Sequence, residues 1–317
     1  MELRVGWVGF HIEGLCAFEN LLNNGTRFQA FITLDEDSIS KRSAGTRKYK
    51  VLCENYNIPY YEIKNINDDS TFELLKKLSL DLIIVIGWSQ ILGFRVLNSA
   101  QIGCVGAHAS LLPHNRGSAP VNWAIIKGEI LGGNSLIWLD EGVDTGKVIG
   151  QIPIPINNYS TCKSIYDEVA QINYILLDRL LKDLEHKKLL ESEVNNLDEG
   201  ILPRRRPSDG AIDWSKSSCD IYNFIRGITK PYPGAFSFIE GKKWTIWSCA
   251  LLPTIDIQKH RYIIGPVISP IDEACGLMVS CGSGSIVLLE IESEDGEIFK
   301  GRDLAELNWK GKEWNYE

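Results

Sequence analysis

The sequence lacks the patterns that mark several common classes of protein. Its eight cysteines include no C-x-x-C pair, which argues against a zinc ribbon and against a thioredoxin-type redox motif. No apolar run approaches the roughly 20 residues of a membrane-spanning helix, and the N-terminus enters a strand pattern without an apolar signal core. We therefore expect a soluble, cytoplasmic protein with reduced, buried cysteines and no membrane partner.

Positively charged residues are also fewer than negatively charged ones. The 33 Lys and Arg residues stand against 41 Asp and Glu residues, which gives a formal net charge of −8. Since non-specific nucleic-acid binding depends on a basic face, this balance argues against a nucleic-acid partner. The contents of 44% apolar and 23% charged residues are those of a folded globular protein, and 317 residues correspond to about two domains.

The glycine motifs of common nucleotide sites are missing too. The turn after the first apolar run contains Gly6, Gly9 and Gly14, which do not have the G-x-G-x-x-G spacing, and no P-loop occurs anywhere. Asp35 and Asp37 lie near the end of the second expected strand, but without the pyrophosphate turn they do not indicate an NAD site.

What the first 203 residues do contain is an alternation of strand and helix patterns. The near-continuous β-branched run over residues 81–86 is typical of a strand that is buried on both faces. The alternation predicts an α/β domain over residues 1–203, a Rossmann-like parallel sheet with helices on both faces. The expected strands cover residues 3–10, 28–34, 60–63, 81–86 and 133–138, and the expected helices cover residues 13–22, 48–56, 71–78 and 162–190.

The pattern changes after a proline-bracketed basic stretch at residues 202–207. Short strand patterns separated by glycine-rich turns follow, and they predict a small β-barrel domain over residues 204–317, preceded by a helix over 219–227. The expected strands of this domain cover residues 235–239, 244–247, 263–264, 277–279 and 285–291.

Two polar residues follow expected strands in the first domain. His108 comes after a short apolar strand, and Asp144 lies in a glycine-flanked loop after another strand. Because open α/β sheets place ligands at the carboxyl ends of their strands, the two side chains are candidates for an oriented acid–base pair. Each also has an ordinary structural interpretation, as a buried hydrogen-bonded histidine and as a turn-capping aspartate. From these residues alone the reaction stays open.

The segment from His108 to Pro120, followed by the segment from Asp140 to Gly146, resembles the folate-dependent formyltransferase family, which has both motifs at this separation. Residues 203–214 and 230–237 are similar to the OB-like second domain of the tRNA and sugar enzymes of that family. The resemblance covers nearly the whole chain. It is nearest to sugar-nucleotide N-formyltransferases such as the UDP-4-amino-4-deoxy-arabinose formyltransferase domain.

The resemblance implies an enzyme that moves the formyl group of N10-formyltetrahydrofolate to a primary amine through a tetrahedral intermediate, without a metal. His108 and Asp144 match the catalytic histidine and aspartate of the family. The catalytic asparagine, two residues before the histidine, is replaced by Gly106. Another group in its place, a weaker enzyme, and a non-catalytic folate- or nucleotide-binding relative all remain open. The candidate substitutes are Ser110, Gln90 and Asn115.

The resemblance also implies two sets of binding residues. The folate is expected between the loop after the strand over 81–86 and the loop that carries Asp144. Its candidate contacts are Ile86, Gly87, Trp88, Gln90, Leu92, Leu139, Asp140 and Gly142. The candidate contacts of the acceptor are Ser110, Arg116, Gly117, Lys230 and Tyr232.

The acceptor itself is the main alternative left open. The tRNA enzymes of the family have an extra basic loop after the second strand, and here residues 35–48 mix three acidic with four basic residues. We therefore expect a nucleotide-linked amino sugar rather than methionyl-tRNA. The sequence does not determine the sugar, the position of its amine or the nucleotide. It also leaves the oligomeric state open, with a homodimer as one outcome.

Overall fold

The computed structural model describes residues 3–41, 45–186, 200–252, 276–307, 309 and 312–315. The chain divides into two compact units. The first comprises Met1–Pro120, Leu131–Pro155 and Tyr166–Pro203, and the second comprises Val121–Ile130, Ile156–Ile165 and Arg204–Glu317. The chain passes from the first unit to the second for the last time after Pro203. No pattern in the sequence marks the two shorter segments of the second unit that precede this point.

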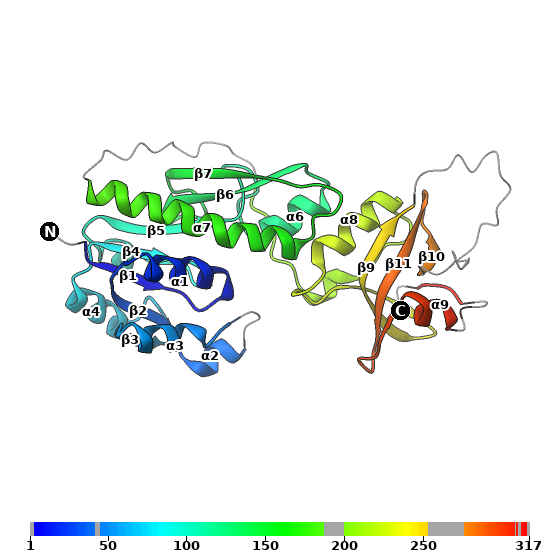
Figure 1. Cartoon of the computed structure of the whole chain (residues 1–317), viewed down its shortest axis with the longest axis horizontal. Helices are drawn as coiled ribbons and strands as arrows, with labels where there is room; N and C mark the ends of the chain where they lie inside the picture. Colours follow the sequence, from blue (N-terminus) through cyan, green and yellow to red (C-terminus); the bar gives the residue numbers. More distant parts are fainter. Residues whose placement is uncertain are drawn as a thin grey trace. The chain divides into compact units, whose positions relative to one another are not determined.

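A seven-stranded sheet forms the first unit, with the strand order β3-β2-β1-β4-β5-β6-β7 (Figure 1). Pairing is parallel from β3 to β5, as predicted, whereas β6 and β7 run antiparallel. The strands are β1 (Val5–Val8), β2 (Phe28–Leu34), β3 (Tyr60–Ile63), β4 (Leu82–Val85), β5 (Gly103–His108), β6 (Leu131–Trp138) and β7 (Val148–Pro155). A short connection joins β6 to β7, and such connections suit antiparallel neighbours because parallel pairs need a crossover.

Helices cover both faces of this sheet because successive strand residues point to opposite sides. Trp7 of β1 packs against Phe18, with ring centroids 5.1 Å apart, on the face of α1 (Leu15–Asn23) and α3 (Lys48–Asn55). Its neighbour Val8 belongs to the core on the other face, together with residues of α4 (Asp69–Leu78) and α5 (Phe94–Leu97). The shorter elements of this unit are η1 (Ile12–Gly14) and α2 (Glu36–Ser40), whereas α6 (Pro120–Ile126) belongs to the second unit from Val121 onward.

A long helix, α7 (Cys162–Glu185), begins in the second unit and continues in the first. Within the first unit it packs on the antiparallel edge of the sheet, where the buried Asn134 of β6 donates to Asn173 at 2.6 Å. The predicted helix over 162–190 extends into residues that lie outside the described part of the chain.

The order of the strands creates a switch point. From β1 the chain moves outward to β2 and β3, whereas β4 returns to the other side of β1 and β5 follows it. Connections therefore leave the carboxyl ends of β1 and β4 in opposite directions, and open α/β sheets bind ligands in the crevice formed there. His108, the last residue of β5, lies one strand beyond this point.

The second unit contains the predicted C-terminal β domain as an antiparallel sheet with the order β10-β11-β9-β8, with β12 paired to β11. Its elements are η2 (Pro207–Gly210), α8 (Ser218–Ile228), β8 (Ala235–Ile239), β9 (Lys242–Leu251), β10 (Leu277–Ser280), β11 (Ser285–Ser293), β12 (Ile298–Lys300) and α9 (Gly301–Glu306). Helix α8 buries Ile221 and Ile225 against the sheet residues Ile246 and Leu288. The strand predicted over residues 263–264 lies outside the described residues.

The cysteines divide between core and surface. Cys53, Cys104 and Cys162 are buried free thiols, and burial raises the pKa of each to about 12. Cys219 of α8 is exposed, which contradicts its predicted core placement. Among the described helices, none has the length and apolar character required to cross a membrane.

Candidate functional site

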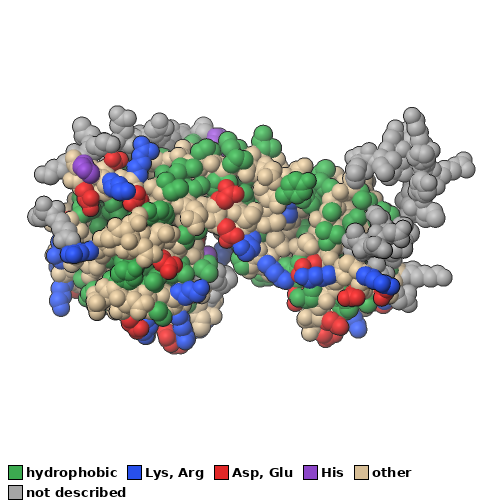
Figure 2. All heavy atoms as spheres, viewed as in Figure 1, with side chains coloured by type: hydrophobic (Ala, Val, Ile, Leu, Met, Phe, Trp, Pro, Cys, Tyr) green, Lys and Arg blue, Asp and Glu red, His purple; other side chains and the backbone are tan. Residues whose placement is uncertain are grey.

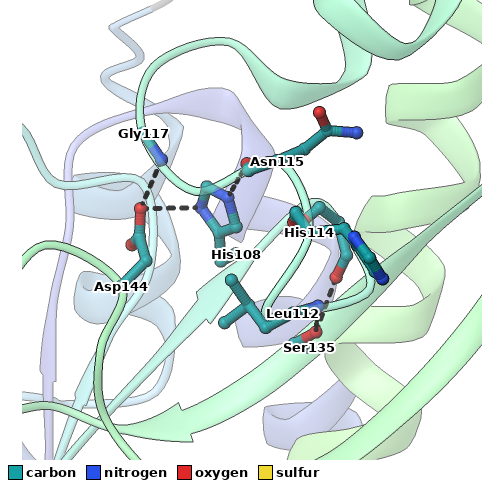
Figure 3. Close-up of polar contacts among 8 residues, drawn as sticks. His108, Leu112, His114, Asn115, Gly117, Ser135 and Asp144 are labelled. Carbon is teal, nitrogen blue, oxygen red and sulfur yellow. Dashed lines mark hydrogen bonds and ion pairs between the residues drawn. The ribbon is translucent and has the colours of Figure 1, made fainter. Parts of the chain in front are cut away.

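The structure brings His108 and Asp144 together (Figure 3). His108 Nδ1 lies 3.4 Å from Asp144 Oδ2, and Nε2 lies 2.8 Å from the carbonyl oxygen of Asn115. His108 ends β5 and is only 8% exposed, whereas Asp144 lies in the loop between β6 and β7 with a φ of 53°. The two side chains therefore come from neighbouring strands, as the sequence analysis expected of an acid–base pair.

These contacts fix the orientation of the His108 ring. A carbonyl oxygen only accepts hydrogen bonds, so Nε2 must carry a hydrogen towards Asn115. The other ring nitrogen faces a carboxylate oxygen, which also accepts. Both ring nitrogens therefore have an acceptor in this structure, and the two contacts together set the orientation of the ring. Donation from His108 to an oxygen on a bound substrate requires Nε2 to exchange the Asn115 carbonyl for that oxygen.

Asp144 is fixed by a second contact on the same oxygen. The backbone N–H of Gly117 donates to Asp144 Oδ2 at 2.9 Å. Gly117 has a φ of 106°, and an added Cβ would lie 2.6 Å from the carbonyl oxygen of Leu202. Leu202 pairs with this loop through its N–H, which donates to the carbonyl of Arg116 at 2.7 Å. Gly117, a candidate acceptor contact, thus orients the carboxylate because only glycine fits its backbone position.

Gly117→Ala is expected to lower both stability and turnover. The Cβ would meet backbone atoms of Leu202, which cannot rotate away, and the φ of 106° is strained for alanine. We expect a loss of about 2–3 kcal/mol in the free energy of unfolding and a loss of kcat by about 10². Urea unfolding and steady-state kinetics measure the two quantities. A matched control is Gly25→Ala, since nothing lies within 4 Å of a Cβ there although φ is 89°; equal kinetic losses in both variants would contradict the role of Gly117.

The loop between His108 and Gly117 is braced by polar groups that no motif revealed. Ser135 of β6 is fully buried, donates to the carbonyl of Ser110 at 2.5 Å and accepts from Leu112 N–H at 3.1 Å (Figure 3). Gln151 of β7 donates to Ser135 Oγ at 2.8 Å and to the carbonyl of Leu112 at 2.7 Å. The sequence shows a Ser and a Gln within two apolar segments, but their pairing across the strands depends on the sheet register, which the sequence does not specify.

No side chain of the three candidate substitutes replaces the asparagine missing at Gly106. Gln90 accepts from Ile66 N–H at 2.8 Å and donates to the carbonyl of Lys64 at 3.0 Å, so its amide is engaged by the segment after β3. Ser110 Oγ donates to the carbonyl of His114 at 2.7 Å. Asn115 contacts the His108 ring through its backbone carbonyl, and its side chain points away from the ring (Figure 3).

Leu139 occupies the space beside Gly106. A Cβ on Gly106 would lie 2.8 Å from Leu139 Cδ2, and it would project from the same face of β5 as His108 because the two positions are two residues apart. Leu139 is anchored by its N–H, which donates to the carbonyl of Cys104 at 2.8 Å. The structure therefore has an apolar side chain where the family's amide would project.

The candidate folate contacts after β4 form a largely apolar wall. Ile86 and Leu92 are buried, and the carbonyl of Gly87 accepts from the N–H groups of Phe10 and His11 at 3.4 and 3.3 Å. Trp88 packs against Phe10 with ring centroids 5.8 Å apart. Its indole Nε1 is buried and has no hydrogen-bond partner among the described residues. A buried, unused donor in an apolar wall fits an aromatic heterocycle that carries acceptor atoms at its edge, such as a pterin.

The candidate folate contacts before Asp144 form a turn. Asp140 Oδ1 accepts from Gly142 N–H at 3.1 Å and from the Thr145 hydroxyl at 2.7 Å. The Asp140 side chain thus shapes its own loop, and the exposed residues of that loop remain accessible to a ligand.

The candidate acceptor contacts fall into both units. Ser110, Arg116 and Gly117 belong to the first, in the loop that follows His108. Lys230 and Tyr232 belong to the second, where Lys230 Nζ lies 3.1 Å from Glu290 and 4.7 Å from the centroid of the Trp247 ring. Within the described ranges, no group of three or more His, Cys, Asp or Glu side chains is arranged to hold a metal ion.

A further carboxyl lies in the turn after β1, where the sequence analysis expected an ordinary helix over residues 13–22. Glu13 belongs to η1, and its side chain is 22% exposed. Burial raises the pKa of Glu13 to about 7 and lowers the pKa of its neighbour His11. The sequence shows only a His-x-Glu segment directly after the first strand. The burial that makes the Glu13 carboxyl unusual comes from tertiary packing, which this segment does not reveal.

The raised pKa of Glu13 predicts a pH-dependent stability. Between about pH 4.5 and pH 7 the folded chain binds a proton that the unfolded chain has lost, so the free energy of unfolding falls as the pH rises through this range. Above pH 7 the decrease in the free energy of unfolding reaches about 3 kcal/mol, since each pKa unit corresponds to about 1.4 kcal/mol. Glu13→Gln should therefore raise stability at pH 8 by about this amount and leave it unchanged at pH 4. Urea unfolding at the two pH values measures the difference; an equal stability at pH 8 would contradict the raised pKa.

Comparisons with known proteins agree with this architecture. Residues 30–181 match the family described as formyl transferase, and residues 205–308 match the formyl transferase C-terminal domain. The chain is 34% identical over 269 residues to a methionyl-tRNA formyltransferase of Geotalea uraniireducens, covering 83% of each chain. It is 30% identical over 312 residues to the bifunctional polymyxin resistance protein ArnA of Wigglesworthia glossinidia brevipalpis, covering 98% of this chain and 46% of that protein.

Solved structures share the fold at low sequence identity. WlaRD, a sugar 3N-formyl transferase whose crystal contained dTDP and 5-N-formyl-THF, has a TM-score of 0.65 at 16% identity, covering 94% of this chain and 100% of that chain. An N-formyltransferase from Helicobacter canadensis in complex with folinic acid and dTDP-3-aminofucose has a TM-score of 0.65 at 19% identity, covering 90% and 98%. HypX from Aquifex aeolicus in complex with tetrahydrofolic acid also has a TM-score of 0.65 at 16% identity, and 98% of this chain spans 48% of that chain.

Proposed function

Because the chain belongs to the formyl transferase family and is a folate-dependent formyltransferase, we propose that its acceptor is the primary amine of a nucleotide-linked amino sugar. The observation that carries this proposal is the charge of the segment after β2. Asp35 caps helix α2, whose first residues are Glu36 and Asp37, and Arg47 lies 3.5 Å from Glu36 in an ion pair. A tRNA acceptor needs a basic surface at such a segment, whereas a sugar nucleotide needs cations only at its diphosphate.

The distribution of charge over the rest of the molecule supports this acceptor. On the face shown in Figure 2, Lys and Arg side chains are interspersed with Asp and Glu side chains. The net charge of −8 opposes association with a polyanion. One structural neighbour is described as a sugar 3N-formyl transferase, and another, an N-formyltransferase, is described in complex with dTDP-3-aminofucose.

The His108–Asp144 pair has a defined role in this reaction. N10-formyltetrahydrofolate supplies the formyl group when it is bound. One C–N bond forms at the acceptor and one breaks at the donor, and a proton passes from the acceptor nitrogen to the donor nitrogen. Negative charge develops on the formyl oxygen during the transfer, and the His108 Nε2–H is a donor suited to stabilise it once it exchanges the Asn115 carbonyl for that oxygen. Asp144 orients the ring through its contact with Nδ1.

Methionyl-tRNA is the second candidate acceptor, and the curated relatives favour it. The Geotalea protein, at 34% identity over most of both chains, is named a methionyl-tRNA formyltransferase. Both acceptors present a primary amine, so the chemistry at His108 is common to them. The two acceptors differ in the part of the molecule that the protein contacts beyond the amine.

The test offers both acceptors separately. Purified protein and N10-formyltetrahydrofolate are incubated with a panel of dTDP-, UDP- and GDP-linked amino sugars and, in a parallel reaction, with methionyl-tRNA. Mass spectrometry detects addition of a formyl group to the amine. We expect a formylated sugar nucleotide; formylation of methionyl-tRNA with no product from any sugar nucleotide would overturn the proposal.

A further inference from the structure

The loop that follows β5 provides a backbone contact to each member of the His108–Asp144 pair. The carbonyl of Asn115 accepts from His108 Nε2 at 2.8 Å, and the N–H of Gly117 donates to Asp144 Oδ2 at 2.9 Å (Figure 3). Because both contacts use backbone groups, their positions depend on the path of the loop rather than on a side-chain rotamer. The groups that fix this path therefore also fix the geometry of the pair.

Three polar residues lie in register across β5, β6 and β7. His108 of β5 is paired with Ser135 of β6, and Ser135 is paired with Gln151 of β7. The side chains of directly paired residues in an antiparallel sheet project from the same face, where they are close enough to interact. Gln151 therefore lies on the same face as His108, on the edge strand of the sheet and two strand spacings, roughly 10 Å, away.

The buried hydroxyl of Ser135 uses all of its hydrogen-bonding positions. It accepts from Leu112 N–H at 3.1 Å and from Gln151 Nε2 at 2.8 Å, and it donates to the carbonyl of Ser110 at 2.5 Å. A hydroxyl has one hydrogen and two lone pairs. Since the two N–H donors occupy both lone pairs, the single hydrogen is directed to the Ser110 carbonyl. The N–H of Ser110 donates in turn to the carbonyl of His108 at 2.8 Å, so these bonds lead back to His108.

The amide of Gln151 is oriented by the loop that it contacts. Its Nε2 donates to the carbonyl of Leu112 at 2.7 Å as well as to Ser135 Oγ, so both hydrogens of the amide nitrogen are used. The reverse orientation would place the amide oxygen against the Leu112 carbonyl, and two acceptors do not form a hydrogen bond. The position therefore requires a side chain that donates twice, which a carboxylate of the same shape does not do.

We propose that Gln151 is a positioning residue for formyl transfer, which acts through Ser135 on the loop that contacts His108. By fixing the start of this loop at Leu112, it determines where the Asn115 carbonyl meets the His108 ring. The inference rests on the proposed role of His108 and holds for either acceptor amine. A displacement of about 1 Å at a reacting group costs about 10² in rate, even when its cause lies far from the chemistry.

Gln151→Met and Gln151→Glu test the proposal, with the same two changes at Gln29 as matched controls. Methionine keeps the length of the side chain and removes both donors, whereas glutamate keeps its shape and presents only acceptors to the loop. Gln29 is a half-buried residue of β2, a strand of the same sheet that β1 and β4 separate from β5. For the amine that the wild type formylates, we expect both Gln151 variants to lower kcat by about 10². Both Gln29 variants should match the wild type.

Binding measurements separate positioning from a general loss of structure. We expect the KM for N10-formyltetrahydrofolate and the Kd for tetrahydrofolate to be unchanged in both Gln151 variants, so that the loss appears in kcat alone. A weakened Kd would overturn the proposal, because it would indicate a structural role. Full activity in Gln151→Glu would also overturn it, since the shape of the side chain rather than its two donated bonds would then matter.

Ser135→Ala tests whether Gln151 acts through Ser135. Each change breaks the same connection to the loop, so Gln151→Met combined with Ser135→Ala should have a kcat within about threefold of the slower single variant, as expected for residues that are coupled. If the two losses multiply instead, the residues act independently and the proposal is wrong.

The His108 ring is also observed without turnover. In protein labelled with ¹⁵N-histidine, the hydrogen on His108 Nε2 is protected from exchange by its bond to the Asn115 carbonyl, and His108→Asn identifies its NMR signal. We expect the signal to persist in Gln29→Met and to shift or disappear in Gln151→Met. An unchanged signal in Gln151→Met would overturn the proposal. If the wild type formylates neither class of acceptor, the proposed function fails, and this signal still decides whether Gln151 positions His108.

Discussion

Asp144→Asn is expected to lower kcat for formyl transfer by about 10⁴ while leaving the fold intact. The amide oxygen of Asn replaces Oδ2 as the acceptor for Gly117 N–H, so the loop keeps its anchor. The amide group then faces His108 Nδ1 without the negative charge of the carboxylate. Because His108 Nε2 donates to the Asn115 carbonyl, the change removes the carboxylate acceptor that orients the ring through Nδ1.

The control for this variant lies in the same loop. Glu141 is exposed, and Glu141→Gln removes one negative charge close to Asp144 without touching the His108 contacts. Steady-state kinetics gives kcat, and binding of tetrahydrofolate reports whether the loop is still formed. Equal kcat values for Asp144→Asn and the wild type, with tetrahydrofolate binding retained, would remove the His108–Asp144 pair from the reaction.

Gly106→Asn is expected to raise kcat by about 10², because one oxyanion donor is worth about 10²–10³ in turnover. The asparagine would project from the same face of β5 as His108, and an N–H of its amide would supply the donor that Ser110, Gln90 and Asn115 do not. The obstacle is Leu139, whose Cδ2 lies 2.8 Å from the new Cβ. This atom is the end of a flexible side chain rather than backbone, so a rotamer change relieves the contact.

Two further variants separate the amide from the steric change. Gly106→Leu fills the same space without a donor and should lower kcat, whereas Gly106→Asn combined with Leu139→Ala removes the crowding and should retain the gain. Stopped-flow or steady-state measurement of tetrahydrofolate release gives kcat for each. Unchanged or lower turnover in both asparagine variants, with tetrahydrofolate bound normally, would mean that a different group already stabilises the oxyanion.

Much of the first unit could be predicted from local patterns. Buried strands such as Leu82–Val85 are apolar on both faces, and amphipathic helices such as Asp69–Leu78 alternate with the strands at short spacing. The directions of β6 and β7 could not be predicted, because an apolar strand pattern does not specify whether its neighbour runs parallel or antiparallel. The segments 121–130 and 156–165 of the second unit have no compositional boundary either.

The candidate site likewise combines residues that the sequence predicts with contacts that it does not predict. His108 and Asp144 follow strands, and the rule that ligands bind at strand ends was enough to single them out. The groups that hold them come from elsewhere in the chain: Leu202 pairs with Gly117, and Gln151 reaches Leu112. These contacts join residues far apart in the sequence, and no local signal specifies them. The raised pKa of Glu13 could not be predicted for a similar reason, because it follows from burial in the folded chain rather than from its neighbours in sequence.

The acceptor is tested most directly by competition in one reaction. The protein receives ¹³C-labelled N10-formyltetrahydrofolate together with equal concentrations of methionyl-tRNA and a nucleotide-linked amino sugar that the panel identifies, and mass spectrometry follows the label. The charge of the segment after β2 and the His108–Asp144 site predict that the label accumulates on the sugar amine. Label found only on methionyl-tRNA would contradict the proposed acceptor.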